Sequence, residues 1–114
     1  MSAKTLVLFV LVLLLALAAP ASMAGDVEAG KAKAAICMGC HGPQGMGADQ
    51  TDTQPAYPQI AGQREAYLAE SMKAYKTGKR KELQYPERKL MRSIAQGLSD
   101  KEIQNLAAYY ASLR

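Results

Sequence analysis

Residues 37 to 41 of this 114-residue chain read Cys37-Met38-Gly39-Cys40-His41. The two cysteines and the histidine are the only ones in the sequence. The spacing Cys-x-x-Cys-His is the attachment pattern of c-type haem. Each thiol can add to one haem vinyl group, and the histidine that follows directly can supply an axial nitrogen to the iron. We therefore expect one covalently bound haem c per chain, with thioether bonds at Cys37 and Cys40 and with His41 as an axial ligand.

Three other uses of the cysteine pair fit the sequence less well. A Cys-x-x-Cys disulfide oxidoreductase has a thioredoxin-like fold with βαβ units, and the sequence shows no βαβ pattern. A structural zinc site needs four ligands, and the sequence offers only three good ones. A structural disulfide suits an oxidising compartment, but it leaves the role of His41 unexplained. The motif therefore favours haem over these alternatives.

Residues 1–24 have the layout of a secretory signal peptide. A positive start precedes an unbroken apolar run over residues 6–19, and small residues precede a cleavage site after Ala24. The alternatives are cleavage after Ala21 and a retained membrane anchor, although a spanning helix needs about 20 apolar residues. We expect cleavage after Ala24, so that residues 25–114 form one domain in the periplasm.

The 90 residues after this leader contain few large apolar side chains. They have no Phe and no Trp, and Leu, Ile and Val together number 11, or about 12%. Chains that build an apolar core usually exceed roughly 20% for such residues. A haem is a large, flat and mostly apolar body, and it would complete a core that the side chains alone leave thin.

Helical signals follow one another along this domain, and no segment shows convincing strand alternation. The expected elements are a helix from Asp26 to about Ile36, a loop over residues 42–62, a helix from Arg64 to about Thr77, a short helix from Pro86 to a stop at Gly97, and a helix that begins after Ser99. Ser99 with Glu102 three positions later is a capping box. The sequence therefore predicts an all-α fold.

Four motifs occur along the chain in a fixed order. They are Cys37-x-x-Cys40-His41-Gly42, then Pro58-x-Ile60-x-Gly62-Gln63 with Tyr67-Leu68, then Met91 with Leu98-Ser99-Asp100, and finally Ala107-Ala108-Tyr109-Tyr110. With these motifs the chain resembles a small bacterial class I c-type cytochrome, and it is similar to one half of the dihaem periplasmic cytochromes. The resemblance implies three to five helices around one haem, with His and Met as axial ligands.

Four methionines of residues 25–114 are candidates for the second axial ligand. Met38 lies between the cysteines and cannot reach the opposite face of the haem. Met46 follows His41 by five residues, which span at most about 18 Å, and Met72 falls on an apolar helix face where packing is the usual role. Met91 has the reach, and it precedes Leu98 by seven residues, as the ligand does in the family that the chain resembles. We expect Met91 to be the axial ligand opposite His41.

The resemblance also implies roles for residues around the haem. Iron-bound histidines usually donate their second N–H to a fixed acceptor, and in the family this acceptor is a proline carbonyl. Pro58 matches that position, with a simple turn proline as the alternative. Ile60 is expected in the haem surroundings. Arg64 is a candidate partner for a haem propionate or else a solvated surface residue.

The first and last helices of the family cross in close contact. Gly30 and Tyr110 match this crossing, where a glycine lets the backbones approach and an aromatic ring covers the gap. Tyr109 is a rival for the role of Tyr110.

An iron whose two axial positions are filled by protein has no open site for a substrate. We therefore expect a one-electron carrier between periplasmic redox proteins, and not an enzyme. The alternative is a haem-bearing electron-transfer subunit of a larger dehydrogenase or oxidase complex.

Basic residues gather in one stretch of the sequence: Lys73, Lys76, Lys79, Arg80, Lys81, Arg88, Lys89 and Arg92. They form either solvated helix faces or a basic rim that steers acidic redox partners. The domain has 13 Lys and Arg against 10 Asp and Glu, since only Lys4 is lost with the leader. A charge of about +3 without interleaved aromatics does not suggest a nucleic-acid partner. We expect a monomer that reaches a membrane only through a partner complex.

Overall fold

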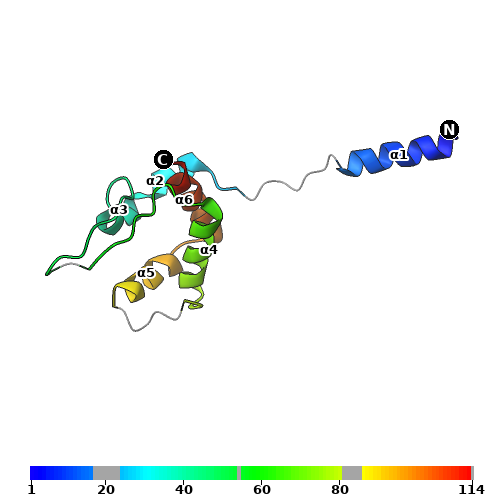
Figure 1. Cartoon of the computed structure of the whole chain (residues 1–114). Coiled ribbons are helices and arrows are strands. Elements are labelled where there is room, and N and C mark those ends of the chain that lie inside the picture. Colours follow the sequence, from blue (N-terminus) through cyan, green and yellow to red (C-terminus); the bar gives the residue numbers. More distant parts are fainter. Residues whose placement is uncertain (17–23, 54, 81–85, 114) are drawn as a thin grey trace.

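The chain folds into helices joined by loops (Figure 1). This computed structural model describes residues 1–16, 24–53, 55–80 and 86–113. The helices are α1 (Ala3–Ala16), α2 (Val27–Lys33), α3 (Ala35–His41), α4 (Glu65–Lys76), α5 (Pro86–Gln96) and α6 (Asp100–Ser112). Within the described ranges, strand-like pairing is limited to one isolated bridge between Ala48 and Tyr57. The predicted all-α fold is confirmed.

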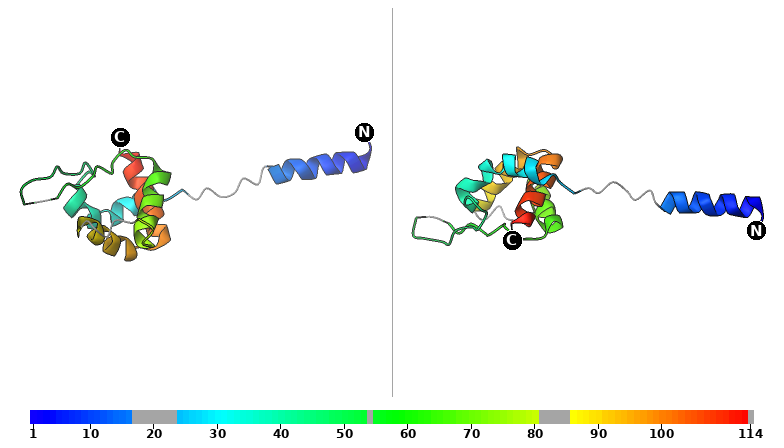
Figure 2. Two further views of the ribbon diagram at one scale, coloured as in Figure 1. Left: turned by 60° about the horizontal axis from the view of Figure 1, so that its bottom comes forward. Right: turned by 90° about the horizontal axis from the view of Figure 1, so that it is seen from above.

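Helix α1 lies apart from the other helices in all the ribbon views (Figures 1 and 2). Its 14 residues are mostly apolar, and the side chains from Leu6 to Val12 are exposed. No helix among the described residues has both the length and the apolar character to cross a membrane. Ser22 and Met23 lie outside the described residues, so cleavage after Ala24 stays a prediction.

The helix expected from Asp26 to about Ile36 is in fact two helices. Asp26 does cap α2, since its carboxylate accepts two backbone N–H groups of the first turn at 2.9 and 3.1 Å. At Ala34 the N–H bonds to the Lys31 carbonyl, three residues back, and α3 begins at the next residue. Ala34 is fully buried. A tight turn at a buried alanine therefore separates the helix that packs on α6 from the helix that carries the Cys-x-x-Cys-His motif.

Helices α2 and α6 cross where Gly30 lies against Asn105 and Tyr109. A Cβ on Gly30 would overlap the Asn105 carbonyl and lie 2.8 Å from the Tyr109 Cβ. The predicted glycine at the crossing is confirmed, but the prediction of Tyr110 as its partner is wrong. Tyr110 instead covers Gly45 of the loop, with ring carbons 2.7 and 2.8 Å from the place of a Gly45 Cβ. Successive helical residues point about 100° apart, so the two tyrosines meet different neighbours.

The later helices begin and end close to the predicted residues. Arg64 and Thr77 are the N-cap and C-cap of α4. Helix α5 begins at Pro86 and ends one residue before Gly97. At the start of α6, the Ser99 Oγ accepts the Glu102 N–H at 3.1 Å, and the Glu102 carboxylate accepts the Ser99 N–H at 2.9 Å. The predicted capping box is confirmed.

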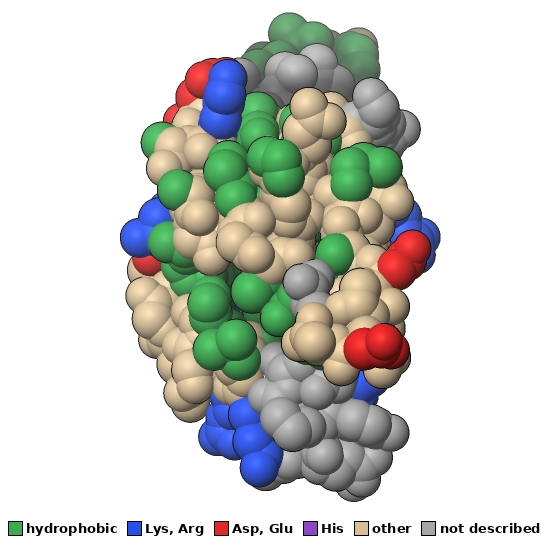
Figure 3. Space-filling view, turned by 90° about the vertical axis from the view of Figure 1, so that its left-hand side faces the viewer, with side chains coloured by type: hydrophobic (Ala, Val, Ile, Leu, Met, Phe, Trp, Pro, Cys, Tyr) green, Lys and Arg blue, Asp and Glu red, His purple; other side chains and the backbone are tan. Residues whose placement is uncertain are grey.

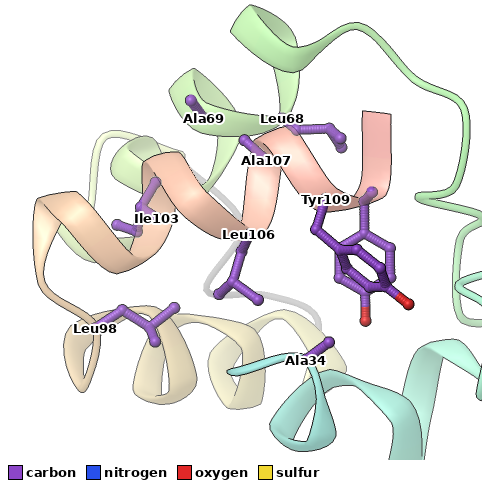
Figure 4. Packing of buried hydrophobic residues seen from close by; sticks show 9 residues of the cluster. Ala34, Leu68, Ala69, Leu98, Ile103, Leu106, Ala107 and Tyr109 are labelled. Atoms are coloured by element: carbon purple, nitrogen blue, oxygen red, sulfur yellow. The ribbon is translucent and has the colours of Figure 1, made fainter. Parts of the chain in front are cut away.

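The hydrophobic core lies around α6, which packs against α2 and α4 (Figure 4). The buried hydrophobic residues among those described are Ala34, Ala61, Leu68, Ala69, Ala95, Leu98, Ile103, Leu106, Ala107, Ala108, Tyr109 and Tyr110. Six of these twelve are alanine, and only Ile103 and Leu106 are large and fully buried. This core is thin, and it leaves open the space on one side of α6.

Candidate cofactor cavity

A large cavity lies between α3, the loop over residues 42–62, α4, α5 and α6. Its volume is about 1000 Å³, at the upper end of the roughly 300–1,000 Å³ of ligand pockets. Its lining includes Cys37, Cys40 and His41 of α3, Ile60 of the loop, Met72 and Tyr75 of α4, Met91 and Ile94 of α5, and Leu106 and Tyr110 of α6. Protein interiors are close-packed, so a cavity of this size and lining fits a large and mostly apolar group such as haem.

His41 ends α3 and is oriented by the loop. Its Nδ1 lies 2.8 Å from the Pro58 carbonyl oxygen, and a carbonyl can only accept, so Nδ1 carries the proton. This tautomer leaves the lone pair of Nε2 available to bind a metal. The predicted contact between His41 and the Pro58 carbonyl is therefore present.

The loop approaches Pro58 closely at Gly47, which helps to fix this carbonyl. The Gly47 N–H donates to the His41 carbonyl at 2.8 Å. Gly47 has φ 77°, and a Cβ there would lie 2.8 Å from the Pro58 carbonyl carbon. Glycine is favoured at this position by both its backbone conformation and the lack of space. Tyr57 adds its ring edge to His41, with ring centroids 6.3 Å apart.

Cys37 and Cys40 are both partly buried and free thiols. Burial raises the pKa of the Cys37 thiol, the neighbouring Tyr110 hydroxyl lowers it, and the charge of Cys40 raises it further. Burial thus favours the neutral form of the Cys37 thiol. Among the described residues, no group of three or more His, Cys, Asp and Glu side chains is arranged to hold a metal ion.

Tyr110 brings a polar group to the wall of the cavity. Its hydroxyl is buried without a fully formed hydrogen bond among the described residues, although Cys37 is near enough to affect it. Burial, followed by the charge of Cys37, raises the pKa of the Tyr110 hydroxyl. Buried polar groups are rarely left unpaired, so this hydroxyl marks a wall that is incomplete without a further group.

Three of the four candidate methionines line the cavity: Met46, Met72 and Met91. Met38 instead packs against the hydrophobic core, and Met72 lines the cavity while it also packs there. Met46 is 59% exposed. Met91 reaches the cavity from α5, a different element from the α3 that carries His41.

The arginines that line the cavity differ from Arg64, the arginine that the sequence suggested. Arg64 is the exposed N-cap residue of α4 and lines a neighbouring pocket that shares Gln63 and Tyr67 with the cavity. Its predicted place in the haem surroundings stays a prediction. Arg80 and Arg88 line the cavity instead. The Arg80 guanidinium carbon lies 4.8 Å from the centre of the Tyr75 ring. The sequence left both arginines either on solvated helix faces or in a partner-facing rim, and only the fold shows that they line the cavity.

Hydrophobic side chains also gather on the surface that Figure 3 shows, with Lys and Arg toward its edges. Within the basic stretch, Lys76 is paired with Asp100 at 3.2 Å. Lys79 and Lys89 are exposed, and Lys81 lies outside the described residues. Among the described lysines of this stretch, Lys79 and Lys89 are therefore the exposed candidates for a partner-facing rim.

Comparisons with known proteins agree with the cavity and its motif. The family model "Cytochrome c" matches residues 27–114. Cytochrome c-554(548) of Halomonas halodenitrificans is 45% identical over 89 residues, which cover 78% of this chain and 98% of that protein. A thiosulfate dehydrogenase electron acceptor of Stutzerimonas stutzeri is 38% identical over 77 residues, which cover 68% of this chain and 32% of that protein.

The fold has a counterpart among solved structures. The cytochrome c4 of Acidithiobacillus ferrooxidans matches with a TM-score of 0.65 and 27% identity, over 82% of this chain and 53% of that chain. This chain spans about half the length of the cytochromes c4 that it matches. The similarity to one half of a dihaem cytochrome, expected from the motifs, is confirmed.

Proposed function

The chain belongs to the cytochrome c family, and from this premise we propose that His41 and Met91 hold the iron of its covalent haem from opposite faces. The chain is a one-electron carrier with one haem c. The observation that carries the proposed ligation is the cavity, which His41 lines from α3 and Met91 from α5. When bound, the haem supplies one reversible electron change between ferric and ferrous iron.

The two cysteines fix the cofactor in the cavity. Cys37 and Cys40 would each hold the haem through one thioether bond to a former vinyl group, and the two bonds would tie α3 to the cofactor.

His41 and Met91 set the electronic properties. The Pro58 carbonyl holds the His41 ring in the tautomer whose Nε2 faces away from the loop bond. A methionine thioether favours the ferrous state and raises the reduction potential. With both positions filled by side chains, the iron has no open site for a substrate. This supports electron transfer without catalysis.

Arg80 and Arg88 are the residues that we assign to the haem carboxylates. A haem carries two propionates, and carboxylates in a mostly apolar cavity need positive partners. Both arginines line this cavity, whereas Arg64 does not. Ile60 contributes apolar lining from the loop.

The proposed setting is the periplasm, after removal of residues 1–24. The family of electron carriers and the apolar α1 support export. The proposed partners are redox proteins with acidic docking surfaces, met by a monomer through Lys79, Lys89 and the arginines near the cavity. The alternative, a haem-bearing subunit of a larger complex, is favoured by the match to a thiosulfate dehydrogenase electron acceptor.

Electron exchange measured against ionic strength tests the carrier proposal. The exported protein should show a low-spin c-type spectrum in both redox states and should purify without a partner chain. Reduction by an acidic redox protein should slow as salt rises. Lys79→Glu should lower the association rate, and Lys31→Glu on α2, which does not line the cavity, should not. Rates indifferent to salt and to Lys79→Glu, or co-purification with a dehydrogenase or an oxidase, would contradict the diffusible carrier and favour the subunit.

A further inference from the structure

The backbone at Gly25 and Asp26 is held by side chains from two distant helices. The Gly25 nitrogen donates to Glu65 Oε1 of α4 at 3.1 Å, and the Asp26 nitrogen donates to Asn105 Oδ1 of α6 at 2.8 Å. Glu65 and Asn105 are 40 and 79 residues away in sequence. Two side chains thus accept hydrogen bonds from two consecutive backbone N–H groups at the point where the folded domain begins.

Only glycine fits at position 25. A Cβ there would overlap the Gln104 carbonyl group and lie 2.6 Å from the Asn105 nitrogen. These are backbone atoms of α6, which cannot move aside as the end of a flexible side chain can. The site therefore selects a glycine directly before the Asp26 cap of α2.

Hydrolysis of the bond between Ala24 and Gly25 changes what this site holds. Water adds across the peptide bond, so Ala24 leaves as a carboxylate and the Gly25 nitrogen becomes an ammonium group. The neutral N–H that faces Glu65 is then replaced by a cation facing a partly buried carboxylate. The bond from the uncleaved amide already has one ionised partner; after cleavage both partners are ionised, and coulombic attraction adds to the hydrogen bond.

We propose that Glu65 is the receptor site for the N-terminal ammonium group of a mature chain that starts at Gly25, while Asn105 holds the next backbone N–H, that of Asp26. This inference rests on the proposed cleavage after Ala24. First residues of most domains are poorly ordered unless they are tied down; here α4 and α6 tie down the first two. Processing thus adds an ion pair between the chain start and α4, beside the unchanged hydrogen bond from the Asp26 N–H to Asn105 of α6.

A double-mutant cycle on the ferric holoprotein tests the receptor site. One pair of proteins starts at Gly25, with Glu65 or with Glu65→Gln. The second pair starts at Ser22, so that the nitrogen of Gly25 remains a neutral amide. The measurement is the unfolding equilibrium constant at neutral pH from denaturant titration. Glu70→Gln, at an exposed position of the same helix, is the control for loss of a negative charge.

In the chain that starts at Gly25, Glu65→Gln should raise the unfolding constant roughly two- to fivefold, as for a partly exposed ion pair. In the chain that starts at Ser22, its effect should be clearly smaller, and Glu70→Gln should have little effect in both. Equal effects of Glu65→Gln in the two backgrounds would overturn the receptor site.

Intact mass of the naturally exported protein separates this inference from the processing that it assumes. A natural chain that starts at Ser22 or retains residues 1–24 would refute cleavage after Ala24. The cycle would still report on the receptor, since both starts are made with chosen leaders. A natural start at Gly25 with no coupling to Glu65 would refute the receptor alone.

Discussion

His41 is the proposed iron ligand of α3, and its geometry depends on a backbone atom of another segment. The Pro58 carbonyl accepts from Nδ1 at 2.8 Å, so it fixes both the tautomer and the direction of Nε2. Because the acceptor belongs to the backbone, side-chain substitution in the loop acts on His41 only by moving the chain. Gly47 packs on Pro58 with no space for a Cβ. The loop around residues 47 and 58 is therefore part of the iron site.

Met91→Ala tests the second ligand. The variant should keep its covalent haem, since Cys37 and Cys40 are untouched, but it should bind carbon monoxide in the ferrous state. The reduction potential should fall by on the order of 0.1 V, within the ~0.8 V range that axial ligands span. The near-infrared sulfur-to-iron band of the ferric protein should disappear.

Met72→Ala is the matched control for Met91→Ala, because Met72 also lines the cavity. It should keep the band and exclude carbon monoxide. The reverse pattern, with the band lost in Met72→Ala and kept in Met91→Ala, would assign the ligand to α4.

Arg80→Gln tests the carboxylate site in the cavity. Loss of a positive charge near the haem stabilises the ferric state, so the reduction potential should fall by on the order of tens of millivolts. A propionate without its cation should ionise at a higher pH. The pH range over which the reduction potential changes should therefore move upward. Voltammetry between pH 5 and 9 measures both effects. Lys89→Gln, at an exposed position of α5, should change neither, and equal shifts in the two variants would contradict the assignment.

The residues that the sequence predicted to bond to the cofactor, Cys37, Cys40, His41 and Met91, all line the cavity, whereas some predictions for its surroundings differ from the structure. The spacing within Cys37-x-x-Cys40-His41 involves only neighbouring residues, so the motif can be recognised without knowledge of the fold. The choice between Tyr109 and Tyr110 depends on the rotation of α6 against α2, which one residue changes by about 100°. The sequence placed Arg80 among surface charges, because its approach to the cavity depends on how the chain turns at the end of α4.

At the scale of elements, helix ends with a side-chain cap were predictable and the break at Ala34 was not. Asp26 and Ser99 accept backbone N–H groups of the turns that follow them, and these are local signals. Ala34 has high helix propensity, and nothing in the local sequence marks it as a turn. Tertiary packing requires the break, because α2 must lie on α6 while α3 must face the cavity.

Gly30→Ala tests the crossing of α2 and α6. The added Cβ would overlap the Asn105 carbonyl, so the helices must separate, at a cost of about 1–3 kcal/mol. Denaturant titration of the ferric holoprotein measures this loss. Gly97→Ala is the control, because its Cβ would meet only the Ile94 carbonyl oxygen at 3.4 Å, and its effect should stay within about 0.5 kcal/mol. Equal stabilities of the two variants would show that the crossing tolerates a side chain.

Glu102 makes the junction of α2 and α6 sensitive to acid. Lys33, at 2.8 Å, is the main cause of a lowered pKa for the Glu102 carboxyl, and the Ser99 N–H adds to it. The folded pKa of this carboxyl lies below its unfolded pKa of about 4.3. Its ionised form therefore adds to the stability of the fold at pH values above about 4.3. That contribution is lost as the pH falls through the lower, folded pKa.

Unfolding midpoints measured between pH 3 and 6 should therefore drop more in the wild type than in Glu102→Gln. Glu28→Gln, at an exposed position in the first turn of α2, should keep the steeper wild-type dependence. If Glu102→Gln titrates as the wild type does, the acid sensitivity comes from another group.

Helices α2 to α6 form a thin helical layer beside a cavity. The composition already predicted a thin core, because 11 branched aliphatics in 90 residues supply little apolar surface. The structure shows the consequence: half of the twelve buried hydrophobic residues among those described are alanine, beside a cavity of about 1000 Å³. Core and cofactor site are therefore parts of one apolar interior.

The haem-free chain, made as Cys37→Ala with Cys40→Ala, should accordingly be molten or largely unfolded. The cavity of about 1000 Å³ is partly open to solvent, so without haem its apolar lining on α4, α5 and α6 would face water. The hydrophobic burial that favours the packing of these helices would then be reduced, in a domain whose stability is typically only about 5–15 kcal/mol. Helix α5 should loosen most, because it contributes Met91 and Ile94 to the cavity wall.

Amide dispersion in NMR spectra of residues 25–114 measures the outcome. Cys37→Ala alone is the control, because one thioether at Cys40 still holds the haem and should preserve a dispersed spectrum. A cooperative, well-dispersed spectrum of the double variant would show that α2, α4 and α6 form an independent core and that the cofactor only occupies it.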